Sequence, residues 1–430
     1  MPSIKEKLRA LDGLSNPKTG ETFKEKKPLP QYITEIEGEL QYNPHGYVII
    51  REKNFPLDYV HGACLENFTK ISGREFSLIA KNRDYAQILP DQILFFDTET
   101  TGLAGGTGTF IFLIGFGYLK GKAIHIKQYF IDEYKNEHAL LIETSKLLKR
   151  FQVLGSFNGK SYDLPLLRTR FILNRIPFEF ENYFHLDLLH PSRRLWKKKL
   201  GKCDLQNIEH NILGFRRSDD IPGAEIPARY FSFLQNRDFA PIKPILQHNA
   251  MDILTLFSIA IYLSYGFQFK MDINIDEYDI FGLLKTFEDM GLYRDSIIMS
   301  GQSAKRLPGE QSFEILMRSA RNHKKLGELG KAEKIWVHII ENSSRFYAEP
   351  YIELAKLYEH KKKKVADALQ IIGRLEKRLH IIRELGGEGS VPAQLVRDDL
   401  QHRKNRLLKK LAKEINFEEN KHDDRKTVSA

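Results

Sequence analysis

The sequence predicts an α/β domain in the first two thirds of the chain and an all-α domain after it. Three observations lead to this prediction. Short apolar runs alternate with helical patterns over residues 91–265, strand signals stop after about residue 270, and small residues then recur at a fixed spacing. Alternating strands and helices are typical of a layered α/β architecture, whereas regular spacing in a helical region indicates a structural repeat.

Length and composition are those of a soluble protein with two or three domains. The 430 residues are 42% hydrophobic and 11% aromatic, which is enough for packed cores. Cys64 and Cys203 lie far apart without CxxC spacing, so neither a disulfide framework nor a zinc knuckle is expected. We expect residues 1–30 to be a polar, disordered lead-in rather than a secretory signal, and we expect no membrane span. A cytoplasmic location follows as the expectation.

The charge balance favours an anionic partner. The chain has 66 Lys and Arg against 56 Asp and Glu, which gives a formal net charge of +10 and a pI near 9.2. Nucleic acid is the commonest partner of such a protein. Many basic proteins bind no nucleic acid, however, so charge alone leaves the partner open.

The first elements belong to residues 31–90, which we interpret as a small β-rich extension packed on the domain that follows. Residues 46–56 read as a strand, and residues 76–80 as a strand or a short helix. Their apolar runs are short and turns separate them, as in other β-rich segments.

Residues 91–265 form the predicted α/β domain. Nearly continuous apolar runs indicate buried strands, and apolar residues at helical spacing indicate helices. The predicted strands are 92–100, 110–119, 123–131 and 153–159, and the predicted helices are 136–151, 163–174 and 245–263. Three neighbouring strands followed by alternating helices and strands are the order of a mixed sheet with flanking helices.

The helical domain covers residues 270–382. Ser296, Ala332 and Ala368 lie 36 residues apart, and Gly291 and Gly327 share that offset, whereas the third unit has Lys363 instead of glycine. Around them lie three pairs of helical segments: 277–290 with 293–303, 312–326 with 330–342, and 349–360 with 364–380. This pattern predicts TPR-like helical hairpins, with an irregular helical domain as the alternative. Residues 383–430 are expected to form a basic helix, to about residue 415, and a disordered charged tail.

The strongest candidate site residues are acids. Asp97 and Glu99 end a predicted strand two positions apart, so both side chains lie on one face. Two like charges side by side are costly unless a cation binds them, and Mg²⁺ prefers such oxygen ligands. The alternative is a strand end whose two acids are simply solvated.

Further candidates lie later in the chain. Asp163 follows the strand at 153–159, where the alternative role is that of a helix N-cap. His248 and Asp252 are four residues apart on a predicted helix and therefore share a face. The alternative for this pair is a simple polar contact.

Taken together, "FDTET", "FNGKSYDLPLL" and "HNAMD" resemble the motifs of the DEDD (DnaQ-like) 3′–5′ exonuclease superfamily. The resemblance covers residues 91–265 and implies an RNase H-like domain. With the helical region behind it, the chain is similar overall to the YprB-type proteins of bacteria. The resemblance implies that Asp97, Glu99, Asp163 and Asp252 bind two divalent metal ions, Mg²⁺ or Mn²⁺.

His248 departs from the two well-known subtypes of that superfamily. One has histidine five residues before the last aspartate and the other has tyrosine four before it, whereas here histidine stands four before Asp252. That change rotates a helical side chain by about 100°. We expect His248 to orient or deprotonate water if the backbone compensates. Asp187 in "FHLDLLHP" is expected to be an accessory acid or, alternatively, a helix cap.

Several segments are candidates for holding a substrate. Residues 192–202 place cations around an aromatic side chain, which suits phosphates and a stacked base, and the alternative is a solvated helix face with the tryptophan in the core. The glycine-rich residues 102–110 and the segment "FNGKSYD" are further candidates, although the former fits a plain hairpin equally well. The expected contacts are Thr100, Thr101, Gly102, Asn158, Tyr162, Arg193, Arg194, Trp196 and Lys197.

The expected function is a metal-dependent nuclease, with 3′–5′ exonuclease activity implied by the resemblance. The alternative is a nucleic-acid-binding scaffold whose RNase H-like domain is inactive or weakly active. In either case the TPR-like helices are expected to recruit a protein partner or to guide the substrate. A phosphohydrolase of small molecules is disfavoured by the basic segment around Trp196. The choice of DNA or RNA, the polarity and the oligomeric state are not predicted.

Overall fold

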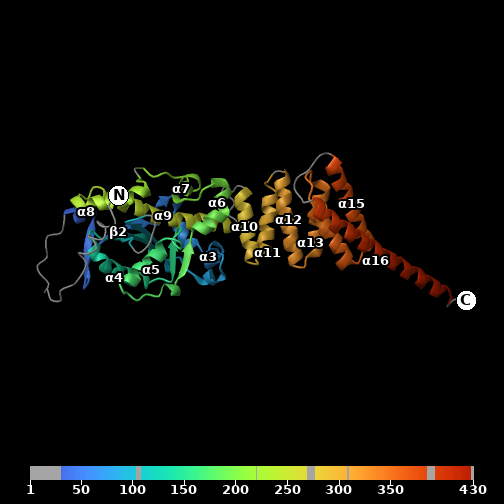
Figure 1. Cartoon of the computed structure of the whole chain (residues 1–430), viewed down its shortest axis with the longest axis horizontal. Helices are drawn as coiled ribbons and strands as arrows, with labels where there is room; N and C mark the ends of the chain where they lie inside the picture. Colours follow the sequence, from blue (N-terminus) through green and yellow to red (C-terminus); the bar gives the residue numbers. More distant parts are fainter. Residues whose placement is uncertain are drawn as a thin grey trace. The chain divides into compact units, whose positions relative to one another are not determined.

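The computed structural model describes residues 31–102, 108–218, 220–268, 277–307, 309–384 and 393–427. The chain divides into two compact units, Met1–Asp279 and Ile280–Ala430, which Figure 1 colours from blue to yellow and from yellow to red. The predicted lead-in at 1–30 and residues 103–107 of the glycine-rich segment lie outside the described residues.

A seven-stranded mixed sheet organises the first unit, in the order β1-β2-β7-β6-β5-β8-β9. The pairs β5–β8 and β8–β9 are parallel, and the remaining neighbours are antiparallel. The strands are β1 Gly38–Asn43, β2 Gly46–Pro56, β5 Ile93–Thr100, β6 Ile111–Lys120, β7 Ala123–Phe130, β8 Val153–Ser156 and β9 Phe184–Asp187. This arrangement confirms the predicted mixed sheet.

Two strands of the segment 31–90, which was predicted to pack on the following domain, extend the sheet of that domain. β2 pairs with β7 in the register Ile49↔Phe130, and β1 pairs with β2. The rest of the segment is largely helical, and residues 76–80 belong to a helix whose first turn is capped by Glu75, which accepts the N–H of Ser72 at 2.9 Å. Its other elements are α2 Gln31–Glu35, β3 Val60–His61, β4 Ala63–Cys64, η1 Leu65–Lys70, α3 Gly73–Ala80, η2 Arg83–Gln87 and η3 Pro90–Gln92.

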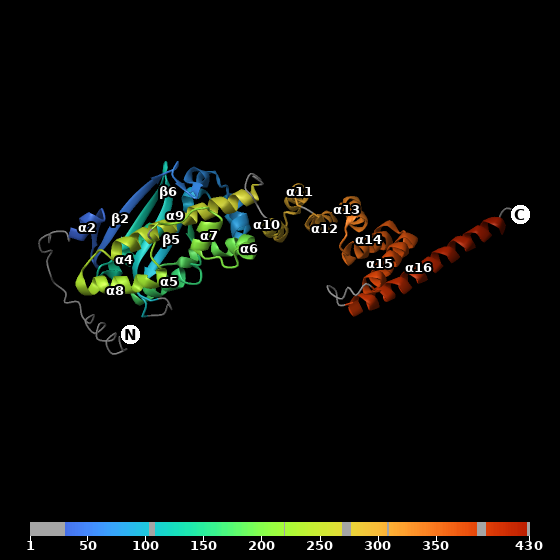
Figure 2. The same cartoon turned by 90° about the horizontal axis from the view of Figure 1, so that it is seen from above.

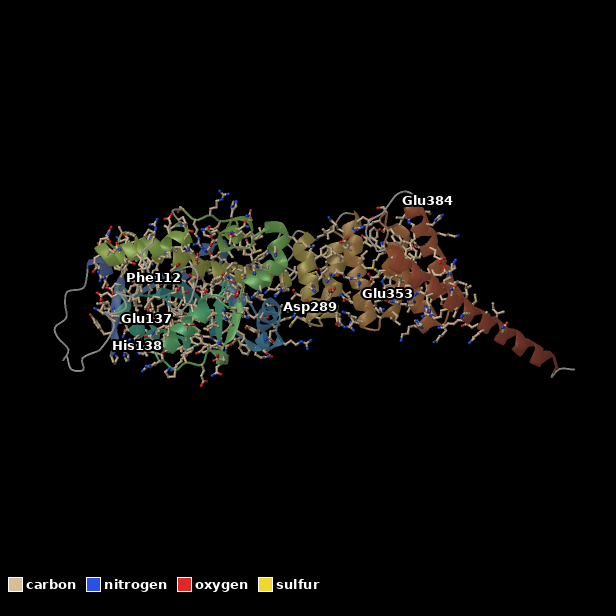
Figure 3. All side chains as sticks on the ribbon, viewed as in Figure 1. Phe112, Glu137, His138, Asp289, Glu353 and Glu384 are labelled. Atoms are coloured by element: carbon tan, nitrogen blue, oxygen red, sulfur yellow. The ribbon has the colours of Figure 1, made fainter. Side chains whose placement is uncertain are left out.

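Helices flank the sheet, and α9 contacts β5, β6 and β7 (Figure 2). The helices are α4 Glu137–Leu148, α5 Asp163–Leu173, α6 Leu189–Leu200, α7 Leu205–Asn211, α8 Ile226–Asn236 and α9 Ile242–Phe267, with short turns η4 Tyr134–Asn136, η5 Phe180–Asn182 and η6 Gly223–Glu225. Glu137 of α4, labelled in Figure 3, forms a buried ion pair with Arg170 of α5 at 2.5 Å. The core contains aromatic side chains of both layers, such as Phe112, which stacks on Tyr230 with ring centroids 3.9 Å apart.

Two glycines of β6 allow α9 to lie close to the sheet. A Cβ on Gly115 would come within 2.1 Å of Asn249 Oδ1, and one on Gly117 within 2.3 Å of Ile253 Cγ2. Both helix residues belong to α9, so the absence of side chains at these positions sets the distance between helix and sheet.

By length and composition α9 could cross a membrane, which the sequence analysis did not anticipate. However, 78% of its most apolar window is buried inside the protein. The helix is apolar on nearly all sides because it is surrounded by protein, as expected of a core helix.

The second unit is helical, as predicted. Its elements are α10 Glu277–Asp289, α11 Tyr293–Ala304, α12 Gly309–Lys325, α13 Leu329–Asn342, α14 Ala348–Lys356, the π-helical turn η7 Leu357–Lys362, α15 Val365–Glu384 and α16 Ala393–Thr427. Ser296, Ala332 and Ala368 are all fully buried. The three equivalent turn positions have positive φ values: Gly291 73°, Gly327 76° and Lys363 56°. These shared features support equivalent helix pairs, and their TPR-like nature stays a prediction.

Charged contacts join helices of this unit that are not consecutive in the sequence. Glu353 of α14, labelled in Figure 3, accepts hydrogen bonds from Lys324 of α12 and, at 2.9 Å, from Lys356. Glu359 is buried and pairs with Arg406 at 2.7 Å and Lys410 at 2.6 Å, which fastens α16. The helix α16 continues to Thr427, beyond the expected limit near 415. Residues 416–427 contain neither Gly nor Pro, so no helix breaker stops the helix where the tail was expected.

Candidate active site

The four predicted acids come from three elements of the first unit. The buried half of β5, Ile93–Phe96, is followed by the partly exposed Asp97 and Glu99. Because β5 and β8 are parallel, their carboxyl ends share one edge of the sheet, and α5 begins with Asp163 shortly after β8. Asp252 belongs to α9, which packs against β5.

Hydrogen bonds tie these elements together. Asn249 of α9 donates from Nδ2 to Asp97 Oδ2 at 3.0 Å. Thr98 of β5 donates from Oγ1 to Asp163 Oδ1 at 2.5 Å. Asp163 is the first residue of α5, and the N-cap position is taken by Tyr162. The N-cap role, which was the alternative for Asp163, is not observed, because Tyr162 takes that position and the carboxylate of Asp163 accepts from Thr98 of β5.

Electrostatic repulsion marks this place as a site. Burial, and then the charges of Asp252 and Asp163, raise the pKa of Asp97 well above its usual value. Burial and the charge of Asp97 raise the pKa of Glu99 in the same direction. Burial raises the pKa of Asp163 from 3.8 to about 6, against the effect of the hydrogen bond from Thr98. Carboxylates that disfavour one another's charge in this way are stabilised by a cation.

The donor set suits divalent ions that prefer oxygen, as the family resemblance implies. Glu99 has no hydrogen-bond or ion-pair partner among the described residues, so its carboxylate is available to a ligand. Within the described part of the chain, no three His, Cys, Asp or Glu side chains already stand as a ready-made metal site.

Asp252 is already paired with a cation of the protein. Arg217 Nη2 lies 2.5 Å from Asp252 Oδ1. The same guanidinium group donates from Nε to Glu209 Oε2 at 2.9 Å, and the side chain of Arg217 is only 6% exposed. Asp252 and Glu209 outweigh the effect of burial and raise the pKa of Arg217, so the guanidinium remains charged.

His248 contacts two acids with its two ring nitrogens. Nδ1 lies 2.6 Å from Asp220 Oδ1, and Nε2 lies 3.5 Å from Asp252 Oδ2. The spacing of four residues thus places His248 beside Asp252 on one face of α9. Hydrogen bonding and the charge of His248 overcome burial and lower the pKa of Asp220.

Asp187 orders the chain near the site. Its Oδ1 accepts the N–H groups of Asn158 at 2.8 Å and Leu189 at 3.0 Å, and its Oδ2 accepts that of Lys160 at 3.0 Å. The residue is buried, with 4% exposure. These contacts support the capping alternative, because both oxygens are occupied by backbone groups.

The predicted substrate contacts near the acids lie at the end of β5 and just after it, and in the segment between β8 and α5. Thr100 Oγ1 donates to Gly102 O at 2.8 Å, and Thr101 Oγ1 accepts the N–H of Phe110 at 2.9 Å, which closes the loop after β5. Asn158 adopts a left-handed conformation with φ 65°, and Tyr162 is 60% exposed directly before Asp163. Tyr162 is therefore an aromatic surface next to the acids.

The basic segment is only partly available to a substrate. Arg193 and Lys197 of α6 are exposed, whereas Arg194 donates to Ile79 O at 2.6 Å. Trp196 is only 5% exposed. The expectation that Trp196 stacks on a base is wrong, because the apolar face of α6 turns this ring into the core.

Four site residues were not predicted from the sequence: Thr98, Asn249, Arg217 and Asp220. Thr98 and Asn249 lie within the motifs "FDTET" and "HNAMD", where their position beside the acids was a usable signal. No local pattern marks Arg217 or Asp220, since their partners Asp252 and His248 lie on a later helix.

Comparison with known proteins agrees with this fold. The family model of the RNase H superfamily matches residues 94–264, so the first unit carries an RNase H-like domain. The uncharacterized protein YprB of Bacillus subtilis is 34% identical over 347 residues, which cover 76% of this chain and 79% of that protein. The chain belongs to the YprB family.

Two polymerases show more distant similarity. A DNA polymerase of Methanocaldococcus jannaschii is 26% identical over 165 residues, which cover 33% of this chain but only 9% of the polymerase. The solved structure of the family B DNA polymerase from the archaeon Pyrobaculum calidifontis matches with a TM-score of 0.32 and 13% identity, over 57% of this chain and 30% of that one. The matched region is thus a small part of both polymerases.

Proposed function

We propose that the first unit hydrolyses phosphodiester bonds in nucleic acid, as a 3′–5′ exonuclease that works with two divalent metal ions, Mg²⁺ or Mn²⁺. The observation that carries the proposal is the group of Asp97, Glu99 and Asp163, whose pKa values are all raised, with Asp252 beside them. The RNase H-like domain and the sequence similarity to a DNA polymerase support a nucleic-acid substrate.

The four acids would hold the ions. When bound, such ions supply a nucleophile at neutral pH and stabilise the charge that develops at the phosphate. Asn249 keeps the Asp97 carboxylate in place, and Thr98 does the same for Asp163. His248 presents Nε2 next to Asp252, where it orients a water molecule and accepts its proton.

Exposed groups near the acids would hold the substrate. Tyr162 offers an aromatic face on which a terminal base can stack, and Arg193 and Lys197 provide positive charge on α6. The net charge of +10 favours binding of the polyanion. The helical unit is proposed to bind a protein partner, as TPR-like surfaces do.

The test is a cleavage assay with single-stranded DNA and RNA labelled at either end, in Mg²⁺, in Mn²⁺ and in EDTA. We expect stepwise shortening from the 3′ end that requires the metal ion and is abolished by Asp97→Ala. Asp238→Ala removes an exposed acid of the same unit and should cleave like the wild type. Metal-independent cleavage, or equal activity of Asp97→Ala, would overturn the proposed site.

One observation favours a binding role without turnover. Arg217 already neutralises Asp252, so fewer free carboxylates face an ion than the motifs imply. A scaffold of this kind would bind labelled single-stranded DNA or RNA equally well in EDTA and in Mg²⁺, and it would shorten neither nucleic acid. The same assay, read for retained complex as well as for product, separates the two functions.

A further inference from the structure

A buried polar cluster lies outside the four acids, on α7 and on the loop that follows it. It consists of Glu209, Arg217 and Asp220, and we refer to it as the Arg217 cluster. Arg217 binds Glu209 through Nε at 2.9 Å and through Nη2, and its Nη1 lies 3.5 Å from Asp220 Oδ2. The side chains of Arg217 and Glu209 are 6% and 3% exposed. The guanidinium group is therefore held in a single orientation.

The cluster is anchored from the opposite side by further buried groups. Thr255 Oγ1 donates to Glu209 Oε1 at 2.5 Å, and His61 Nε2 lies 2.9 Å from the same hydroxyl group. His61 and Thr255 are 3% and 0% exposed. A continuous set of polar contacts thus runs from the segment 31–90, through α9 and α7, to Arg217.

The Arg217 cluster contacts two site residues, Asp252 and His248, and each contact occupies one polar atom of that residue. Arg217 Nη2 lies 2.5 Å from Asp252 Oδ1, which leaves Oδ2 of that carboxylate. Asp220 Oδ1 lies 2.6 Å from His248 Nδ1, which leaves Nε2 of the imidazole ring. The two remaining atoms lie 3.5 Å apart and face each other.

Stability alone does not account for such a cluster. Burying charged groups costs free energy, and well-packed apolar side chains would stabilise the fold equally well. Fixed hydrogen bonds behind a catalytic or metal-binding side chain, in contrast, hold its orientation and determine which histidine nitrogen carries the hydrogen. The contacts to Asp252 and His248 are of this second kind.

We propose that Arg217 and Asp220 are positioning residues, which present Asp252 Oδ2 and His248 Nε2 as single fixed atoms to the acidic site. The proposal rests on the proposed function and extends it. It also explains how a histidine four residues before the last aspartate can serve this site: Asp220 holds the ring by its other nitrogen. Asp252 would then bind an ion through one oxygen only.

Asp220 is tested through His248. We expect Asp220→Ala to lower kcat at least about 100-fold with little change in KM, as loss of a properly oriented proton acceptor does. Asp220→Asn keeps an oxygen that accepts from Nδ1 and should restore most of the rate. The double variant Asp220→Ala with His248→Ala should be no slower than His248→Ala alone, because one residue acts through the other. Losses that multiply, or a wild-type rate in Asp220→Ala, overturn the role of Asp220.

A second measurement needs no activity. Nitrogen-15 NMR of the histidine rings in EDTA should show that the wild-type His248 carries its hydrogen on Nδ1, and Asp220→Ala should shift that hydrogen toward Nε2. If the wild type neither binds metal nor cleaves, the proposed function fails, while this spectrum still reports on Asp220. An unchanged His248 spectrum in Asp220→Ala overturns the positioning role whatever the activity is.

Arg217 is tested with a variant that keeps the net charge. Glu209→Gln with Arg217→Met removes one negative and one positive charge, which buried pairs often tolerate without loss of stability. We expect calorimetric Mn²⁺ binding to weaken about 10-fold, since second-layer contacts commonly contribute that much. The matched control is Glu225→Gln with Arg229→Met, which removes the 2.9 Å ion pair at the start of α8 and should bind Mn²⁺ like the wild type. Unchanged or tighter Mn²⁺ binding in the folded Glu209/Arg217 variant overturns the role of Arg217, because tighter binding would mean that its guanidinium group competes with the ion for Asp252.

Discussion

At the scale of single residues, the site is a compromise between stability and ligand binding. Burial, and then the charges of neighbouring acids, raise the pKa values of Asp97, Glu99 and Asp163, so their ionised forms destabilise the metal-free fold. Hydrogen bonds from Thr98 and Asn249 offset part of that cost. The free energy of unfolding of this unit should therefore rise when a cation binds the acids.

This compromise predicts that one substitution raises the melting temperature without metal but removes the stabilisation that metal provides. Asp97→Asn removes a repelled charge while keeping an oxygen for Asn249, so its melting temperature in EDTA at pH 7.5 should exceed that of the wild type by roughly 2–4 °C. Saturating Mn²⁺ should raise the melting temperature of the wild type but hardly that of the variant. Thermal unfolding in EDTA and in Mn²⁺ checks both, and a less stable Asn variant in EDTA would contradict the repulsion.

A second prediction concerns His61 and acid pH. Burial and the charge of Arg217 lower the pKa of His61 from 6.5 to about 4. As the pH falls from 6.5 to 4, the unfolded chain binds a proton that the folded His61 does not, so the free energy of unfolding falls by about 3 kcal/mol over this window. Stability from this source is complete above pH 6.5.

Urea unfolding of the wild type and of His61→Gln at several pH values provides the measurement. The glutamine variant can still hydrogen-bond Thr255 and should lose this part of the pH dependence. Buried His185, whose pKa burial also lowers to about 4, remains in both proteins and cancels in the comparison. Parallel curves for the two proteins would show that His61 titrates normally in the folded state.

At the scale of elements, the contact between α9 and β6 controls the site. Asn249 accepts a hydrogen bond from Gln128 at 2.8 Å and donates one to Asp97, and it lies over Gly115. The glycine therefore sets the position of a residue that touches the acidic site. Gly117 lies over Ile253 and Phe257, which carry no site group.

These two glycines give a paired prediction. Gly115→Ala and Gly117→Ala should each destabilise the first unit by about 1–3 kcal/mol, because the added Cβ overpacks the helix–sheet contact. Only Gly115→Ala should also lower cleavage, by about 10-fold or more, because it displaces Asn249 from Asp97. Gly223→Ala, which meets open space, should change neither property. Equal activity losses in both glycine variants would show that Asn249 has no particular role.

Local patterns were sufficient for the elements that carry the acids. The apolar runs at 92–100, 110–119 and 123–131 correspond to β5, β6 and β7, and the periodic segment 245–263 lies within α9. Very short strands, and strand pairings between distant segments, could not be predicted from local patterns. β9 has only four residues, and β1 and β2 join the sheet through β7, which lies far along the chain. Register and sheet order depend on such tertiary contacts rather than on periodicity.

The same distinction holds for the site. The acids belong to local motifs, whereas the contacts that orient them join distant segments: Asn249 and Asp97 are 152 residues apart, and His248 and Asp220 are 28 apart. A single sequence contains no local signal for such pairs. Trp196 was misplaced for a related reason, because charge around an aromatic residue is equally consistent with a buried ring under a solvated helix face.

At the scale of the whole molecule, each unit has a hydrophobic core of its own. Among the described residues, one buried cluster of the first unit gathers residues between Ile33 and Leu246, and one of the helical unit gathers residues between Met317 and Leu407. The candidate acids all belong to the first unit, Met1–Asp279. Metal binding should therefore stabilise one core directly and leave the other unaffected.

Calorimetry of the full chain is expected to show two unfolding transitions, of which only one responds to metal. Saturation of the site at about 100 times its dissociation constant would add about 2.7 kcal/mol to the unit that binds the ion. The variant Ala332→Leu shows which transition belongs to which unit. It overpacks the helical core and should destabilise only the helical unit, by about 1–3 kcal/mol, so the transition that it leaves unchanged is the one expected to respond to metal. Asp97→Ala should abolish the metal response without moving the transition that Ala332→Leu lowers. A single transition would mean that the two units unfold together. A metal response in the transition that Ala332→Leu lowers would mean that the helical unit takes part in binding the ion.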